Sequence, residues 1–226
     1  MKLFGTREPR GRPRRSDFRP RAVPLTPSDA DDALVDRARR GDDEAFAELV
    51  RRHQDPVVSF LAGMLPDRDR AIDLAQEAFV RLHRNLDRYR PEGKFRTFLL
   101  TVAGNAARDF LKARRREGIV YLSDYREILE TRGRPPRRSE EAAPGASLEA
   151  EDRAALVRQA LARVSDSFRE ALLLRDTEGL SYEDISTALG CSVGTAKSRV
   201  SRGREAFRDA FGRLSRRGGV AEREWA

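Results

Sequence analysis

Residues 180–207 read LSYEDISTALGCSVGTAKSRVSRGREAF, and this stretch decides the fold of the C-terminal half. Ser181 is the expected N-cap of a short helix, and Asp184, three residues later, completes a variant of the capping box. Gly190 marks a tight turn, after which Ser192 is the expected cap of a second helix. This arrangement is a helix-turn-helix, whose second helix typically enters the major groove of DNA.

The second helix of this unit has a polar and basic outer face. Val193, Ala196 and Val200 form its apolar side, which leaves the other side free for phosphates and base edges. The residues expected on that DNA-facing side are Thr195, Lys197, Ser198, Arg199, Ser201, Arg202 and Arg204. An ordinary helical hairpin with a solvated face is the alternative interpretation.

Residues 29–116 also show helical periodicity. One helix is predicted from apolar residues at spacings of 3, 4, 3 and 4, namely Ile72, Ala75, Phe79, Leu82 and Leu86. The turn at 90–93 ends it. The next helix is expected to bury Phe95, Leu99, Val102, Ala106 and Phe110, and to carry a basic stripe of Arg108, Lys112 and Arg115.

The chain of 226 residues is predicted to be all-α, with two small helical domains joined by a flexible linker. Prolines and basic residues crowd the first 28 positions, and proline and glycine recur near 134–145, which is typical of tails and linkers. The expected boundaries are a disordered basic tail at 1–28, a first domain at 29–116, a linker at 117–147, a second domain at 148–214 and a C-terminal tail at 215–226.

Charge is distributed unevenly along the chain. The net charge is +6 over 1–28, +8 over 81–116 and +5 over 191–226, while 29–80 and 117–190 carry −6 and −5. Separate basic blocks suggest separate contacts with a polyanion, most simply a nucleic acid.

Composition excludes several classes of protein. No apolar run approaches the roughly 18 residues of a membrane span, and the charged N-terminus has no secretory signal, so we expect a cytoplasmic protein without membrane insertion. One cysteine and two histidines predict neither an internal disulfide nor a metal site, and no cofactor motif is present.

Three stretches resemble one family. SYEDI at 181–185 with LGCSVGTAKSRVSRGR at 189–204 is similar to region 4 of the extracytoplasmic-function (ECF) sigma factors of bacterial RNA polymerase. DLAQEAFVRL at 73–82 resembles the helix of region 2 that binds core polymerase, and FRTFLLTVAGNAARDFLK at 95–112 resembles the helix that melts and reads the minus-10 element. Phe98 stands where this family usually carries tryptophan.

The resemblance implies a function and its residues. It implies a sigma factor, not an enzyme, that binds core RNA polymerase and promoter DNA and has an anti-sigma factor as a further partner. The implied polymerase-binding residues are Asp73, Gln76, Glu77, Val80 and Arg81. The implied minus-10 residues are Arg96, Phe98, Asn105, Arg108, Lys112 and Arg115, and the helix-turn-helix face would read the minus-35 duplex.

Two other function classes compete with this interpretation. A stand-alone helix-turn-helix regulator would bind duplex DNA as a dimer without polymerase, but it leaves 72–116 unexplained and no dimerisation helix is visible. A nuclease needs carboxylates or histidines gathered on one face, and the sequence shows no such pattern.

Overall fold

The computed structural model describes residues 27–116 and 144–218, and these ranges contain helices and no strand. The predicted all-α class is therefore confirmed. The tail at 1–26, residues 117–143 of the linker and the last eight residues lie outside the described residues. No helix of the described part is long and apolar enough to cross a membrane.

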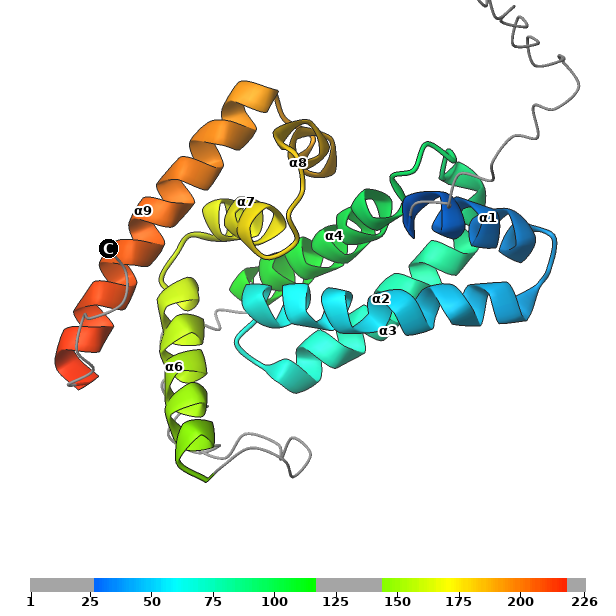
Figure 1. Ribbon diagram of the computed structural model, residues 1–226. Coiled ribbons are helices and arrows are strands. Elements are labelled where there is room, and N and C mark those ends of the chain that lie inside the picture. The colour runs from blue at the N-terminus through cyan, green and yellow to red at the C-terminus, as the bar shows by residue number, and fades with distance from the viewer. Residues whose placement is uncertain (1–26, 117–143, 219–226) are drawn as a thin grey trace, which may run out of the picture.

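The first half is a bundle of α1, α2, α3 and α4 (Figure 1). Its elements are α1 (Pro27–Arg39), α2 (Asp43–Met64), α3 (Arg68–Arg84), the 3-10 turn η1 (Leu86–Arg88) and α4 (Phe95–Arg116). Asp42 caps α2 by accepting a hydrogen bond from the Ala45 amide at 3.1 Å. Phe60 and Phe95 are fully buried in its core.

The second half contains α6 (Pro144–Ala162), α7 (Asp166–Asp176), α8 (Tyr182–Leu189) and α9 (Val193–Gly218). The helix α6 begins at Pro144, four residues before the predicted start of the second domain at 148, and proline is tolerated in a first helical turn, where its missing N–H is not needed. The far end of α9 packs Ala210 and Leu214 against Ala160 of α6.

One sequence expectation about the core is wrong. Ile72 was predicted on the buried side of α3, but 37% of its surface is exposed. The buried side of α3 is centred on Ala71, Ala75, Ala78 and Leu82, so Ile72 falls about 100° away, at the edge of that side. Leu86 is buried, as expected, from the following 3-10 turn.

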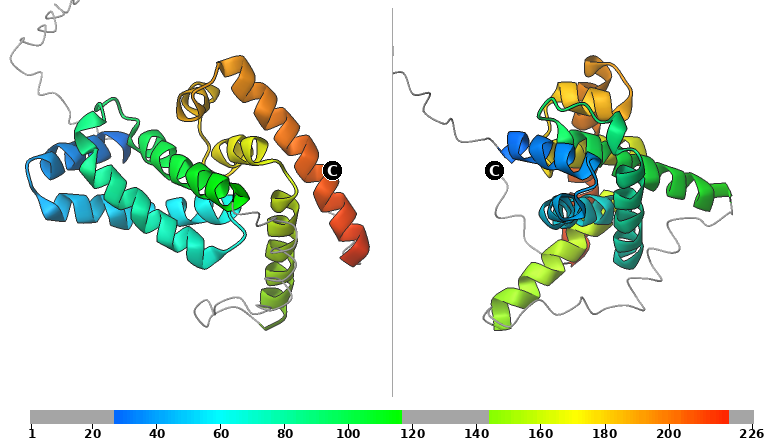
Figure 2. Two further views of the ribbon diagram at one scale, coloured as in Figure 1. Left: turned by 180° about the vertical axis from the view of Figure 1, so that it is seen from behind. Right: turned by 90° about the vertical axis from the view of Figure 1, so that its right-hand side faces the viewer.

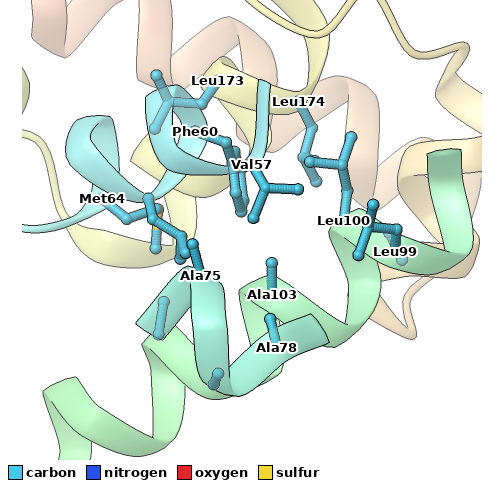
Figure 3. Packing of buried hydrophobic residues seen from close by; sticks show 14 of the residues in the cluster. Val57, Phe60, Met64, Ala75, Ala78, Leu99, Leu100, Ala103, Leu173 and Leu174 are labelled. Carbon is cyan, nitrogen blue, oxygen red and sulfur yellow. The ribbon is translucent and has the colours of Figure 1, made fainter. Parts of the chain in front are cut away.

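The two halves share one continuous core. Within it α7 packs on α2 and α8 packs on α4 (Figures 1 and 2). Figure 3 shows Leu173 and Leu174 of α7 reaching toward Phe60 of α2 and Leu100 of α4. Two tethered domains were predicted; their apolar contact is a finding of the structure.

Candidate nucleic-acid and polymerase interfaces

The helix-turn-helix at 181–204 forms as the sequence predicts. The Ser181 hydroxyl accepts a hydrogen bond from the Asp184 amide at 3.0 Å, and the Ser192 hydroxyl accepts one from the Thr195 amide at 3.1 Å. Gly190 ends α8 in the left-handed conformation, with φ of 59°, which favours glycine. These local bonds fix where α9 begins.

The start of α9 carries the predicted minus-35 residues. Six of the seven are exposed and Arg199 is half-buried. The Lys197 ammonium lies 5.6 Å from the centre of the Tyr182 ring, a cation–π contact. Arg204 is tied to its own half, since its guanidinium donates to both carboxylate oxygens of Asp176 at 3.0 and 2.5 Å.

The predicted minus-10 residues lie along α4, from Arg96 in its first turn to Arg115 in its last. Asn105 and Lys112 are exposed, and Phe98 is half-buried with its ring 5.3 Å from that of Tyr89. The three arginines are ion-paired with carboxylates of the second half: Arg96 with Glu178 at 2.6 Å, Arg108 with Glu170, and Arg115 with Asp166.

The predicted polymerase-binding residues share one side of α3. All five are exposed: Asp73, Gln76, Glu77, Val80 and Arg81. The exposed large hydrophobic side chains of the described residues are Val80, at 50%, and Ile72, at 37%, and both belong to α3. An apolar pair within a charged helix face is typical of a protein-contact surface.

Comparison with known proteins gives the family. The family model described as Sigma-70 region 2 matches residues 49–117, and that described as Sigma-70, region 4 matches residues 154–207. The ECF RNA polymerase sigma-E factor of Escherichia coli K12 is 34% identical over 189 residues, covering 83% of this chain and 97% of that protein. This chain belongs to the ECF sigma factors.

Other relatives of this ECF chain agree with that assignment. The RNA polymerase sigma-H factor of Pseudomonas aeruginosa is 38% identical over 189 residues, covering 82% of this chain and 96% of that protein. The sigma factor RpoE of Bartonella quintana, solved in complex with the anti-sigma factor NepR, matches with a TM-score of 0.54 and 26% identity, over 74% of this chain and 96% of that one. CnrH, solved with the cytosolic domain of CnrY, shares the fold, with a TM-score of 0.55, 24% identity and coverage of 80% and 96%.

Sequence reasoning missed the carboxylates that face α4. Asp166, Glu170 and Glu178 pair with its arginines, and Asp184 of α8 lies 3.0 Å from the Lys94 ammonium just before α4. The only signal in the sequence was the net negative charge of 117–190, which does not show that these carboxylates lie beside α4.

The interface between the halves shifts the pKa of two of these carboxyl groups in opposite directions. Burial raises the pKa of Glu170, although the Arg108 guanidinium opposes that rise. Burial acts the same way on Asp184, but hydrogen bonds from Ser181 and Lys94 prevail and hold its pKa below the ordinary value. The interface therefore disfavours the charged form of Glu170 and favours the charged form of Asp184.

His53 and the cysteine contribute little to these surfaces. His53 is buried and hydrogen-bonded to Asp31 at 2.8 Å, and Cys191 is half-buried in the turn before α9. No three histidine, cysteine or acidic side chains of the described residues gather as metal ligands would.

Proposed function

We propose that this chain is a sigma factor that binds core RNA polymerase and directs initiation at promoters with minus-35 and minus-10 elements. The observation that carries the proposal is the presence of regions 2 and 4 in order in one chain, each with an exposed face where a partner is expected. In this role the chain recognises the promoter and catalyses no reaction. It acts in the cytoplasm, where the polymerase acts.

The polymerase is proposed to dock on the exposed side of α3. Val80 and Ile72 offer apolar area for burial, and Gln76 and Glu77 between them offer polar contacts. Apolar residues within a polar rim are the usual anatomy of a protein interface.

The minus-35 duplex is proposed to bind the start of α9. Thr195, Lys197 and Ser198 lie exposed in its first two turns, the part of a recognition helix that reaches base edges. Arg199, Ser201, Arg202 and Arg204 follow, and their guanidinium and hydroxyl groups suit guanine edges and phosphates.

The minus-10 strand is proposed to bind along α4. Asn105 is exposed, and its amide can hydrogen-bond the edge of an unstacked base, while Lys112 can hold a phosphate. Arg96, Arg108 and Arg115 complete this basic surface once they are released from their carboxylates, and Phe98 borders it.

An anti-sigma factor is the further partner that we propose. Two related structures are solved as complexes, one named with an anti-sigma factor and one with a cytosolic protein domain. In this chain a groove of about 1100 Å³ lies between α2, α6 and α7, and its lining includes the apolar Leu161 and Leu173 and the basic Arg68. This mixture suits an acidic amphipathic helix.

Transcription in vitro tests the function. The full chain is added to bacterial core polymerase with a library of genomic fragments, and the 5′ ends of the RNA are sequenced. We expect start sites that are absent with core alone and that share two upstream motifs. Duplex binding without any polymerase-dependent start sites would instead favour a stand-alone helix-turn-helix regulator.

A matched pair of variants tests the docking surface. Gln76→Ala with Glu77→Ala is expected to weaken retention of the chain on immobilised core polymerase and to reduce all transcripts alike, because no DNA contact is removed. Gln54→Ala removes an exposed amide from α2 and is expected to change neither. Equal retention of both variants would overturn the assignment of α3.

A further inference from the structure

The helix α1 has no part in the binding surfaces proposed above. It precedes residues 49–117, which match region 2. Figure 1 shows α1 beside the turn at 89–94 that joins η1 to α4, and α1 contacts both of these elements. This turn leads directly into Arg96 and Phe98, the first residues of the proposed minus-10 surface. A constraint that α1 places on the turn therefore also acts on that surface.

One carboxylate of α1 holds two points of the turn. Asp32 accepts a hydrogen bond from the Tyr89 hydroxyl at 2.5 Å through one oxygen, and one from the Gly93 amide at 2.8 Å through the other. Gly93 has a φ of 69°, in the left-handed region that favours glycine. The two oxygens of one side chain thus bind near the two ends of the turn.

A second side chain of α1 holds the residues that lead into the turn. The Arg39 guanidinium donates hydrogen bonds to the Leu86 carbonyl oxygen at 2.9 and 3.2 Å, and to the Tyr89 carbonyl oxygen. Arginine side chains often bind the carbonyl groups that are left without partners at the end of a helix. Asp32 and Arg39 are seven positions apart, about two helical turns, so they lie on the same side of α1.

Tyr89 links these contacts to α4. The residue is 4% exposed, and its ring lies 5.6 Å from the Phe95 ring and 5.3 Å from the Phe98 ring. Its hydroxyl also accepts a hydrogen bond from the Lys94 amide at 3.0 Å, just before α4 begins. Burial and the hydrogen bond to Asp32 raise the pKa of Tyr89, so the hydroxyl keeps the proton that it donates.

The polar nature of these contacts separates positioning from packing. Burial of apolar area is non-directional, so a phenylalanine at position 89 would fill the same space. Hydrogen bonds require particular distances and angles, so they select one conformation of the turn. Phe98 is half-buried and borders the proposed minus-10 surface, so the position of its ring depends on that conformation.

We propose that α1 braces the minus-10 surface by holding the turn at 89–94 in one conformation. Asp32 and Arg39 are its positioning residues. Through Tyr89 they set the position of Phe98 and of the start of α4. The brace needs no DNA contact of its own, because it reduces the conformational freedom that the surface loses when a strand binds. The effect on DNA rests on the proposed minus-10 role of α4, whereas the effect on the turn does not.

Hydrogen exchange measures the brace with neither DNA nor polymerase present. Peptides of the full chain that span 87–95 are followed by mass spectrometry. Tyr89→Phe removes the hydroxyl and keeps the ring, and Asp32→Asn leaves one acceptor where two donors converge. In both variants we expect amides of the turn to exchange about tenfold faster, because a hydrogen bond that restrains the turn is lost.

The matched control is Asp43→Asn, which removes an exposed carboxylate from the neighbouring helix α2. We expect this variant to leave exchange in the turn unchanged. Exchange in peptides of α3 reports on the fold of the bundle, and it should match that of the parent chain in all three variants. Unchanged exchange in the turn of Tyr89→Phe and Asp32→Asn, or an equal rise in α3, overturns the brace.

Strand opening tests the effect on the promoter. Permanganate detects unpaired thymines in the minus-10 element of a promoter that the transcription test identifies. We expect Tyr89→Phe and Asp32→Asn to reduce opening about tenfold, because a smaller fraction of the chain has the competent conformation. Retention on core polymerase and affinity for the minus-35 duplex should stay as they are in the parent chain and in Asp43→Asn.

This division between the measurements is what a merely structural role does not produce. A side chain that only stabilises the fold would lower opening, retention and duplex affinity together, and that result would overturn the positioning role. Unchanged opening in a variant whose turn exchanges faster would overturn it as well. If the parent chain gives no promoter-dependent transcripts while exchange in the turn behaves as expected, the proposed function fails and the brace stands.

Discussion

The basic side chains of α4 and α9, the two helices proposed to bind DNA, lie in different surroundings. Along α4, arginines are paired with carboxylates from the other half of the chain. Along the start of α9, six of the seven predicted side chains are exposed and Arg199 is half-buried, and the carboxylate that pairs with Arg204 comes from its own half. The α4 surface therefore depends on the arrangement of the whole molecule, whereas the α9 surface depends on local packing.

This difference separates two kinds of regulation. A surface that faces water is available whenever its domain is folded. A surface paired with another part of the chain becomes available only when the two parts separate, so its affinity for DNA includes the free energy of opening.

The largest expected effect tests the local packing behind α9. A Cβ atom at Gly203 would lie 2.7 Å from the Phe168 carbonyl oxygen of α7, and a backbone atom cannot move aside as a side chain can. Gly203→Val should lower the free energy of unfolding of the second half by about 3 kcal/mol, the upper end of the usual cost of overpacking.

The matched control is Gly212→Val on the same helix, where only the end of the Arg216 side chain is near. It carries the same cost of a β-branched residue in a helix and should be far milder. Thermal unfolding followed by circular dichroism compares the two, and equal shifts of Tm would contradict the close packing of α7 on α9.

The sequence predicted the helix-turn-helix because its determinants are local. Ser181, Gly190 and Ser192 specify their caps and turn within a few residues, whatever the rest of the chain does. The exposure of α3 was also predictable, since charged residues recur there at helical spacing. Ile72 was misplaced because a residue at the edge of an apolar face is buried or exposed according to its neighbours in space.

The pairing of α4 was beyond sequence reasoning. Arg108 and Glu170 are 62 positions apart, and the sequence around each residue does not predict that the two form a pair. Gly104 was available as a clue, because a glycine inside a helix needs a reason, but the reason lies in α7.

The next effect concerns base reading by α9. Arg199→Ala should reduce discrimination between the cognate minus-35 duplex and a scrambled one by about tenfold, or ~1.4 kcal/mol, within the range of a bidentate base contact. Competition binding with the two duplexes measures it. Glu170→Gln serves as the control that removes the nearby carboxylate and leaves Arg199 in place. Unchanged discrimination in Arg199→Ala would move base reading to other residues of α9.

A smaller effect is expected of pH on the contact between Glu170 and Arg108. Glu170 is faced by Arg108, Arg199 and Asp166, and burial raises its pKa. A raised pKa means that the folded chain binds the proton more tightly than the unfolded chain does. This contribution to stability is therefore fully present below the ordinary pKa of glutamate and is lost as pH rises through the raised pKa.

The Tm of the parent chain relative to that of Glu170→Gln should accordingly rise or hold from pH 7 down to pH 5, contrary to the idea that acid breaks a salt bridge. The lowered pKa of Asp184 confines its opposite contribution to more acidic solution, below its ordinary value. Glu170→Gln lacks this dependence, and a parent chain whose Tm falls relative to that of Glu170→Gln on acidification in this window would contradict it.

The smallest effect is expected at Arg204. Its pair with Asp176 is exposed on both sides, and such pairs contribute about 0.2–1 kcal/mol to stability. Arg204→Ala and Asp176→Ala should therefore lower Tm equally and slightly. If Arg204 also contacts DNA, only Arg204→Ala weakens binding of the chain to the minus-35 duplex. Equal affinities of the two variants for this duplex would mean that Arg204 only stabilises the fold.

The buried position of Leu173 has a consequence for the amount of soluble protein in a cell. Its side chain is 5% exposed because it lies against Gly63 of the other half. Any change that displaces Leu173 exposes this side chain to water. The chain then has an exposed apolar patch of the kind that chaperones and proteases act on. Gly63→Gln, which displaces Leu173, should therefore accumulate to lower soluble levels than the parent, whereas Gly212→Gln should not. Accumulation of the chain then depends on this one contact.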